Sequence, residues 1–430
     1  MKKLLSAWIL VSGVVCMSSS AVADNSATTD SSSQVATVAA LRMAGTITGG
    51  TMPYTAPEFT KMVNFIQAGD YYDAAQTAVQ SAYFPSYFVR RFAKQMMNPA
   101  ISDVGIPDND ATTFIVANLI GSGTTANISQ LWSDNSTYMI NVAGTPSHAF
   151  GLSAAQLSAV NWQTDLVRVA GQMAVDQNNN PIAIPQKHVG GYLTLSSKVG
   201  DGSVAAYGLT AGTNLRAIEG IYEITMGLTL PELVVMDGAK AQLVPKFVPE
   251  INPNFFVGQG QPACLTCHGG GASSLTHGYA TMADVFDFDP NNGLTYIAAP
   301  STGSMKSLGS TAGNRQNTLT CNLAKFTVCN PDSYGADPGQ AWDLSTWQAG
   351  GLLNTMGWKG AITGEGLNAL GAAVGQASLV YQFLVQRVIG EICPLGDIGS
   401  AQRANIASQA QAQDSFGYIV AQVASDPSCR

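Results

Sequence analysis

The chain has 430 residues, a formal net charge of −8 and only 11% charged residues, against about 25% in an average soluble protein. An acidic chain repels nucleic acid and anionic lipid, so neither is expected as a partner, whereas a basic protein can dock on it. No apolar stretch after the N-terminal one reaches the roughly 20 residues that a bilayer requires. We therefore expect no membrane span once the N-terminal apolar segment is removed.

The N-terminus has the three parts of a secretory signal. Lys2 and Lys3 precede an apolar run over residues 4–15, and Ala21-Val22-Ala23 supplies the small residues that signal peptidase needs. Cleavage after residue 23 would leave 407 residues (430 minus 23) with a charge of −10, because −8 loses the two lysines. The sequence thus predicts a periplasmic or secreted protein.

The first half of the exported chain divides into a leader and a helical region. Residues 24–37 are rich in Ser and Thr, which predicts a disordered leader. Apolar residues then recur at helical spacing through a region that we place at 38–210. Helices are predicted from Pro57 onward and over 71–83, 87–97 and 110–120, whereas 161–209 has the pattern of loops and short strands.

The second half, which we place at 211–430, alternates helical patterns with a long irregular stretch. Residues 269–341 are dense in Gly, Asn, Ser, Thr and Pro, as is typical of loops. Helical spacing is found over 214–226, 366–389 and 401–423. The predicted fold class is mainly α, a helical N-terminal region followed by a helical region with long irregular loops.

One motif in the second half carries specific chemistry. Cys264-Leu265-Thr266-Cys267-His268 has the Cys-x-x-Cys-His spacing of c-type haem attachment. Two thiols at this spacing can form thioethers with the two vinyl groups of one haem, and the imidazole that follows can ligate the iron. Attachment of this kind takes place outside the bacterial cytoplasm, so the motif and the signal support each other. The predicted cofactor is one covalent haem c, with His268 as the proximal ligand.

Three other interpretations of the cysteine pair remain open. Cys264 and Cys267 could form a redox dithiol, but no βαβ pattern surrounds them. They could supply half of a zinc site, but the chain has no second cysteine pair at short spacing. They could also form an ordinary disulfide.

The sixth iron ligand is left open by the sequence. His277 lies nine positions after His268, and nine residues reach about 30 Å at most, enough to pass round the haem edge. The downstream methionines Met282, Met305 and Met356 are an alternative of equal weight. An iron with an open or water-bound sixth position is the third.

Four further cysteines remain after the signal peptide and the motif are set aside. They are Cys321, Cys329, Cys393 and Cys429, and an even number in an exported chain predicts disulfides. Three connectivities are possible. We favour Cys321–Cys329, which closes a small loop, and Cys393–Cys429, which ties the tail to the C-terminal helices.

Three stretches resemble a group of exported mono-haem c-type cytochrome-like proteins of Gram-negative bacteria. They are Ala211–Ala217, the haem motif with the Phe286-Asp287-Phe288 segment behind it, and Gly366–Pro394. Together they cover about a quarter of the chain, and only the haem motif is specific. The resemblance implies a cytochrome c-like helical haem region, with Cys264, Cys267 and His268 as the haem residues, and implies no reaction.

Three functions are compatible with this pattern. The first is transfer of single electrons between the haem and a periplasmic or outer-membrane redox partner protein. The second is a haem enzyme, peroxidase-like or oxygenase-like, with an open sixth position, because the chain far exceeds the roughly 100 residues of a minimal haem domain. A structural or surface-assembly component with the haem as a relay is a third.

Overall fold

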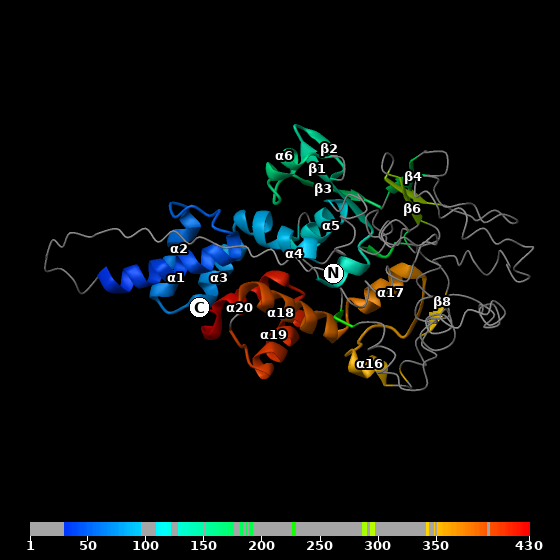
Figure 1. The fold of residues 1–430 in the computed structure, drawn as a ribbon. Coiled ribbons are helices and arrows are strands. Elements are labelled where there is room, and N and C mark those ends of the chain that lie inside the picture. Colours follow the sequence, from blue (N-terminus) through cyan, green and yellow to red (C-terminus); the bar gives the residue numbers. More distant parts are fainter. Residues whose placement is uncertain are drawn as a thin grey trace, which may run out of the picture.

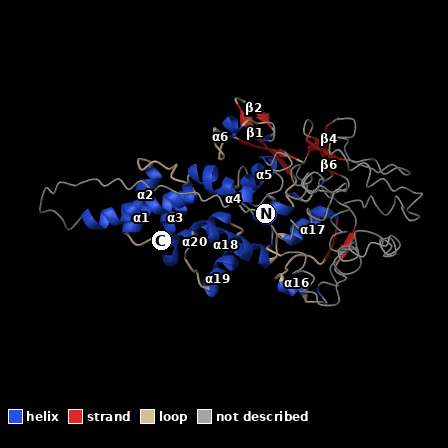
Figure 2. Ribbon diagram, in the orientation of Figure 1, coloured by secondary structure: helices blue, strands red, loops and turns tan. Residues whose placement is uncertain are grey.

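The structure is a computed structural model of the 430-residue chain. Within the residues that it describes, 63% are helical and 9% lie in strands, which confirms the mainly α fold class (Figures 1 and 2). The described residues are 30–95, 109–121, 128–149, 152–171, 173–175, 181–183, 186, 189–191, 226–228, 286–289, 293–296, 341–343, 348, 351–393 and 396–430.

The first helix differs from the sequence expectation. α1 (Asp30–Thr48) begins inside the stretch 24–37, which was predicted to be a disordered leader. The reason is a buried face at helical spacing that includes Ala36, Ala40, Met43 and Ile47. The composition of this stretch, alanines among serines and threonines, does not reveal the apolar face. In the folded chain, α2 packs against it.

The next two helices begin as their sequences predict. α2 (Pro57–Gln67) has Pro57 in its first turn, where the missing N–H costs nothing. α3 (Tyr71–Val79) has Asp70 as its N-cap, whose carboxylate accepts a hydrogen bond from the Asp73 N–H at 3.0 Å. Gln80 ends this helix earlier than the predicted residue 83.

A π-helix follows where the sequence predicted the start of an α-helix. η1 (Pro85–Val89) runs into α4 (Arg90–Gln95), in place of a single helix from residue 87. Pro85 lies in the first turn of η1, where its missing N–H costs nothing. The turn still aligns Phe84, Phe88 and Phe92 in successive ring stacks, with centroids 5.7 and 6.2 Å apart.

A small sheet follows α5 (Asn109–Ile120) and η3 (Ile128–Trp132). Its strand order is β2-β1-β3, with β1 (Ser136–Val142), β2 (Thr145–Ser147) and β3 (Leu166–Ala170) all antiparallel. The short helix α6 (Ala154–Ser158) lies between β2 and β3 in the chain. The β1–β2 hairpin was not predicted. Its two turn residues, Ala143 and Gly144, both have positive φ, the requirement of a type I′ turn.

Two further sheets join distant parts of the chain. The first has the order β5-β4-β7-β6 and contains β4 (Met173–Val175), β5 (Pro181–Ala183), β6 (Phe286–Asp289) and β7 (Gly293–Tyr296). The pair β4–β7 is parallel, with Val175 opposite Thr295. β8 (Ala341–Asp343) and β9 (Thr363–Glu365) form an antiparallel pair.

The C-terminal part is helical, as predicted, but its helices are shorter. They are α16 (Leu352–Thr355), α17 (Gly366–Val374), α18 (Ser378–Ile392), α19 (Ser400–Gln413), α20 (Phe416–Ser425) and the final turn η9 (Pro427–Cys429). The stretch 401–423 holds two helices because Asp414 adopts φ 51°, the left-handed conformation that ends a helix.

The two ends of the chain share one hydrophobic core. α20 packs on α3, and in Figure 1 the last helix in red lies beside the first helices in blue. The Phe416 ring lies 4.8 Å from Phe92 and 6.3 Å from Phe88 between ring centroids. The predicted division at residue 211 falls outside the described residues.

Candidate functional site

Apart from the candidate sixth ligand Met356, which is buried in the hydrophobic core, the residues expected to bind haem lie outside the described part of the chain. These are Cys264, Cys267, His268 and the possible distal ligand His277. Cys321 and Cys329 lie outside it as well. The described residues that come nearest to the motif in sequence are 226–228 before it and strand β6 after it.

Both of these neighbouring segments are attached to the rest of the fold. Met226 and Leu228 are buried in the common core. Between them Gly227 has φ 69° and lies so close to the Phe383 ring that a Cβ atom there would overlap it. On the other side of the motif, β6 pairs with β7, which pairs with β4. Within the described residues, the chain is therefore anchored before the motif, at 226–228, and after it, at β6.

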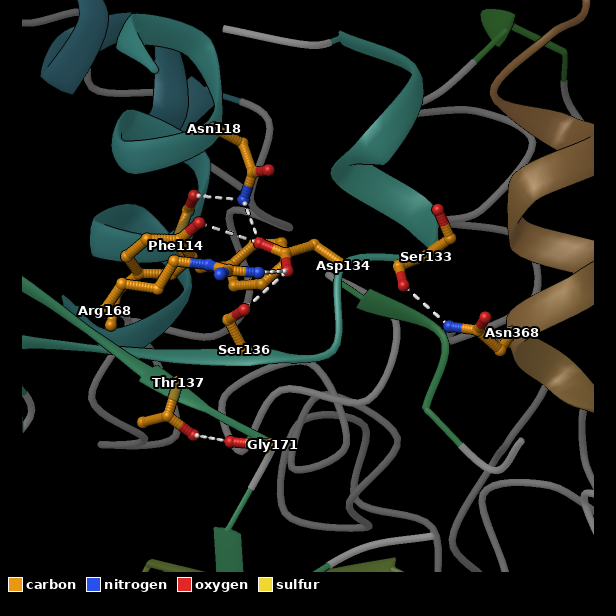
Figure 3. A network of polar contacts seen from close by, with 10 residues as sticks. Phe114, Asn118, Ser133, Asp134, Ser136, Thr137, Arg168, Gly171 and Asn368 are labelled. Atoms are coloured by element: carbon orange, nitrogen blue, oxygen red, sulfur yellow. Dashed lines mark hydrogen bonds and ion pairs between the residues drawn. The ribbon is translucent and has the colours of Figure 1, made fainter. Parts of the chain in front are cut away.

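The most elaborate polar site in the described residues surrounds the carboxylate of Asp134, whose side chain is 4% exposed (Figure 3). Oδ1 accepts from Ser136 Oγ at 2.7 Å and from Arg168 Nη2 at 3.5 Å. Oδ2 accepts from Tyr138 OH at 2.8 Å and from Asn118 Nδ2 at 3.2 Å. A buried carboxylate is tolerated only with such partners.

The strand register explains why these donors meet. Ser136 and Tyr138 are two positions apart and buried on the same face of β1. Arg168 on β3 is the direct cross-strand partner of Tyr138, so its side chain reaches the same face. Asn118 comes from α5, where its amide also donates to the Phe114 carbonyl at 3.1 Å.

The Tyr138 hydroxyl stays protonated in this environment. Burial, and then the negative charge of Asp134 and the hydrogen bond to it, raise the pKa of Tyr138 far above its usual value. Tyr138 therefore acts as a fixed donor, and both carboxylate oxygens are occupied by donors. The chemistry of this arrangement is to join α5, β1 and β3, and it leaves no carboxylate oxygen free to act as a base.

The residue before Asp134 links the site to the C-terminal helices. Asn368 on α17 donates to the Ser133 carbonyl at 2.6 Å and to the Val189 carbonyl at 3.1 Å. Gly371 lies against the backbone carbonyl of Trp132, and Gly375 lies against that of Ser129. Both approaches are so close that a Cβ atom on the glycine would overlap the carbonyl. Only glycine permits this approach of α17 to η3.

A second carboxylate, that of Asp414, joins η3 to the C-terminal helices from another side. Oδ1 accepts from the Ser129 backbone N–H at 2.9 Å and from Tyr381 OH at 2.7 Å, and Oδ2 accepts from Ser129 Oγ. Burial, and then the charge of Asp414, raise the pKa of Tyr381, so this hydroxyl also remains a donor. Asp414 thus satisfies an N–H at the start of η3 from 285 positions away.

The disulfide Cys393–Cys429 closes the C-terminal tail, and this is the pairing that the sequence favoured. Cys393 lies at the end of α18 and Cys429 in η9, 36 positions apart. The last residue, Arg430, places its guanidinium 3.6 Å from the centroid of the Tyr71 ring and donates to the Ser425 carbonyl. The tail is therefore fixed to both α18 and α3.

Two further features are absent from the described residues. Among them, no group of three or more His, Cys, Asp or Glu side chains is placed to hold a metal ion. None of the helices in this part of the chain has both the length and the hydrophobicity to cross a membrane. Neither result bears on the haem motif, which these residues do not include.

Comparison with known proteins returned no match: no protein-family model, curated protein or solved structure is similar to the chain. The resemblance to exported mono-haem cytochrome-like proteins therefore stays a prediction from the three stretches that carry it.

Sequence reasoning missed both hydrogen-bonded carboxylates, the buried Asp134 and the partly buried Asp414. Asp134 lies in a short polar stretch, Ser133 to Ser136, that has the composition of a turn. Asp414 follows a run of Ala and Gln with no feature to mark it. Their partners come from other elements, so no local pattern identifies either residue.

Proposed function

We propose that the chain is an exported mono-haem c-type cytochrome that passes single electrons to a periplasmic or outer-membrane redox protein. The observation that carries the proposal is the Cys264-x-x-Cys267-His268 motif in a chain with a secretory signal. The proposal includes a cytochrome c-like helical haem region within 211–430.

The donor set fits the group. Two thiols at this spacing match the two vinyl positions of one haem, and the imidazole of His268 is a common proximal ligand. Cys264 and Cys267 would hold the haem covalently, and His277 or a methionine would fill the sixth position. When bound, the haem would supply a reversible one-electron centre.

The described part of the chain supports the compartment that this chemistry needs. The disulfide Cys393–Cys429 is typical of proteins that fold outside the reducing cytosol. The acidic charge of the chain, −8, favours a basic redox partner, because opposite charges accelerate encounter at low salt.

Visible spectroscopy tests the proposal. The protein would be purified from a strain that matures c-type haem and examined oxidised, reduced and in a pyridine haemochrome assay. The expected result is a c-type α-band from one haem per chain, low-spin and unchanged by CO. His268→Ala should lose the proximal ligand and become high-spin, whereas His148→Ala, outside the motif, should leave the spectrum unchanged.

Two results would reject the electron carrier. A high-spin wild-type spectrum that changes with CO or peroxide would favour the haem enzyme with an open sixth position. A protein without covalent haem would reject both the electron carrier and the haem enzyme. Cys264 and Cys267 would then be interpreted as a disulfide, a redox dithiol or metal ligands.

A further inference from the structure

The chain before the haem motif and the chain after it are in direct contact throughout the described fold. We call the described residues of 30–171 and 351–430 the helical body. The two halves of the helical body, 30–171 and 351–430, contribute side chains to one hydrophobic core. Phe416, from the second half, fills the space beside the ring stack of Phe88 and Phe92 from the first half, and all three rings are buried.

The polar contacts between the halves are equally direct. Asp414 binds the backbone N–H and the hydroxyl of Ser129, and Asn368 binds the Ser133 carbonyl at 2.6 Å. Arg91 on α4 forms an ion pair with Glu391 on α18 at 2.8 Å. Each of these contacts joins one half of the helical body to the other without a third group between them.

The close backbone approach at η3 adds a steric argument. α17 reaches η3 only because Gly371 and Gly375 have no side chain, and the carbonyls of Trp132 and Ser129 occupy the place of a Cβ atom. A contact this close forms only when both elements are in their final positions. The disulfide Cys393–Cys429 then fixes the last helices in this arrangement.

From these contacts we infer that the helical body closes and forms its disulfide without haem, so that haem attachment is not a condition for folding of this part of the chain. The haem itself rests on the proposed function, whereas the contacts that close the helical body do not. The consequence for maturation is that the haem-attachment machinery can act on a chain whose helical body is already folded.

The test compares three samples of the full chain. They are wild type from a strain that matures c-type haem, wild type from a strain that does not, and the double variant Cys264→Ser/Cys267→Ser. Thermal unfolding is followed by far-ultraviolet circular dichroism, and the Cys393–Cys429 bond by peptide mapping without reduction. Phe416→Ala serves as the control that weakens the helical body directly.

The expected result is one cooperative transition in all three samples, with Tm values within about 3 °C of each other, and the disulfide present in each. Phe416→Ala should lower Tm by more than that, because removal of a buried phenyl ring leaves a cavity. Loss of the transition or of the disulfide in the two haem-free samples would overturn the inference. Absence of haem from the first sample, read from its visible spectrum, would reject the proposed function alone.

Discussion

Among the described residues, the buried carboxylate of Asp134 and the partly buried carboxylate of Asp414 both accept several hydrogen bonds, but over very different distances along the chain. Asp134 gathers donors that lie within 34 positions of it, on α5, β1 and β3. Asp414 accepts from Ser129, 285 positions away, and from Tyr381. Asp134 thus completes a unit that is local in sequence, whereas Asp414 joins η3 to the C-terminal helices, 285 positions away.

The comparison teaches that a hydrogen-bonded carboxylate can either complete a unit that is local in sequence or join segments that are far apart. In both sites every carboxylate oxygen accepts at least one hydrogen bond, which offsets the loss of solvation at the buried Asp134 and the partly buried Asp414. Asp134 also has a cation, Arg168, whose side chain is 43% exposed, whereas the donors to Asp414 are neutral. We therefore expect removal of Asp134 to cost more stability and to act locally, and removal of Asp414 to cost less and to act on both ends of the chain.

The largest effect is expected at Asp134. Asp134→Ala leaves three neutral donors and one arginine without their acceptor, which should lower the free energy of unfolding by about 3–4 kcal/mol. Urea denaturation measures this loss, and the exposed Asp397 offers a control, since Asp397→Ala should change stability by about 0.5 kcal/mol or less. Hydrogen exchange should accelerate mainly in α5, β1 and β3. Equal acceleration in α18–α20 would contradict the local role.

The second-largest loss of stability is expected from removal of the Cys393–Cys429 disulfide at the C-terminal end. Replacing both Cys393 and Cys429 by Ser releases a loop of 36 positions. Loop entropy sets an upper limit of about 4 kcal/mol on the loss, and we expect about 3 kcal/mol because the unfolded chain retains some structure. The midpoint of urea denaturation measures it, with wild type under reducing conditions as a second sample. A variant as stable as the oxidised wild type would show that the tail is held by its other contacts, such as Arg430 on Tyr71.

A smaller loss is expected at Asp414, and two substitutions separate its causes. Asp414→Ala removes the acceptor and places alanine at φ 51°, so it should cost about 2 kcal/mol. Asp414→Asn keeps one acceptor oxygen and tolerates the left-handed conformation, so it should cost about half as much. Hydrogen exchange should accelerate in both η3 and α19. A change confined to α19 would mean that Asp414 does not join the two ends.

The smallest effect concerns alkaline pH and reports on the tyrosine donors of both sites. The pKa values of Tyr138 and Tyr381 are raised above the ordinary value of 10.0 by burial first and then by the neighbouring carboxylates. Above pH 10 the unfolded chain therefore releases protons that the folded chain retains, so stability is complete below that pH and falls above it, by about 1 kcal/mol per pH unit for each tyrosine.

Replacement of Tyr381 by Phe tests this pH dependence. Stability of Tyr381→Phe should fall less steeply than that of the wild type between pH 10 and 11, although it starts lower because Asp414 loses a donor. Tyr54→Phe is the matched control, because Tyr54 is 75% exposed. Parallel pH curves for Tyr381→Phe and wild type would show that Tyr381 titrates normally.

Local features of the fold were predictable, and contacts between distant segments were not. Pro57 marked the start of α2, because proline at the first turn of a helix acts through neighbouring residues. The pairing of Cys393 with Cys429 followed from their positions around the C-terminal helices. Each of these features depends on residues close in sequence or on a simple choice among few cysteines.

The features that escaped prediction depend on packing. α1 is helical because α2 covers its alanine-rich face, although its first turns have the composition of a disordered leader. The turn at Ala143-Gly144 lacks the Asn or Asp that usually marks a type I′ hairpin. For the candidate haem site, the motif itself was recognisable because its chemistry requires a fixed local spacing. Its sixth ligand was not, because that residue depends on the tertiary fold.

The central claim, one covalent haem on Cys264 and Cys267, is tested most directly by intact-mass spectrometry of the purified protein. The wild type from a strain that matures c-type haem should have the mass of the chain that begins after residue 23 plus one haem. The Cys264→Ser/Cys267→Ser variant should have the mass of the polypeptide alone. A wild-type chain with only the mass of its polypeptide would contradict the account.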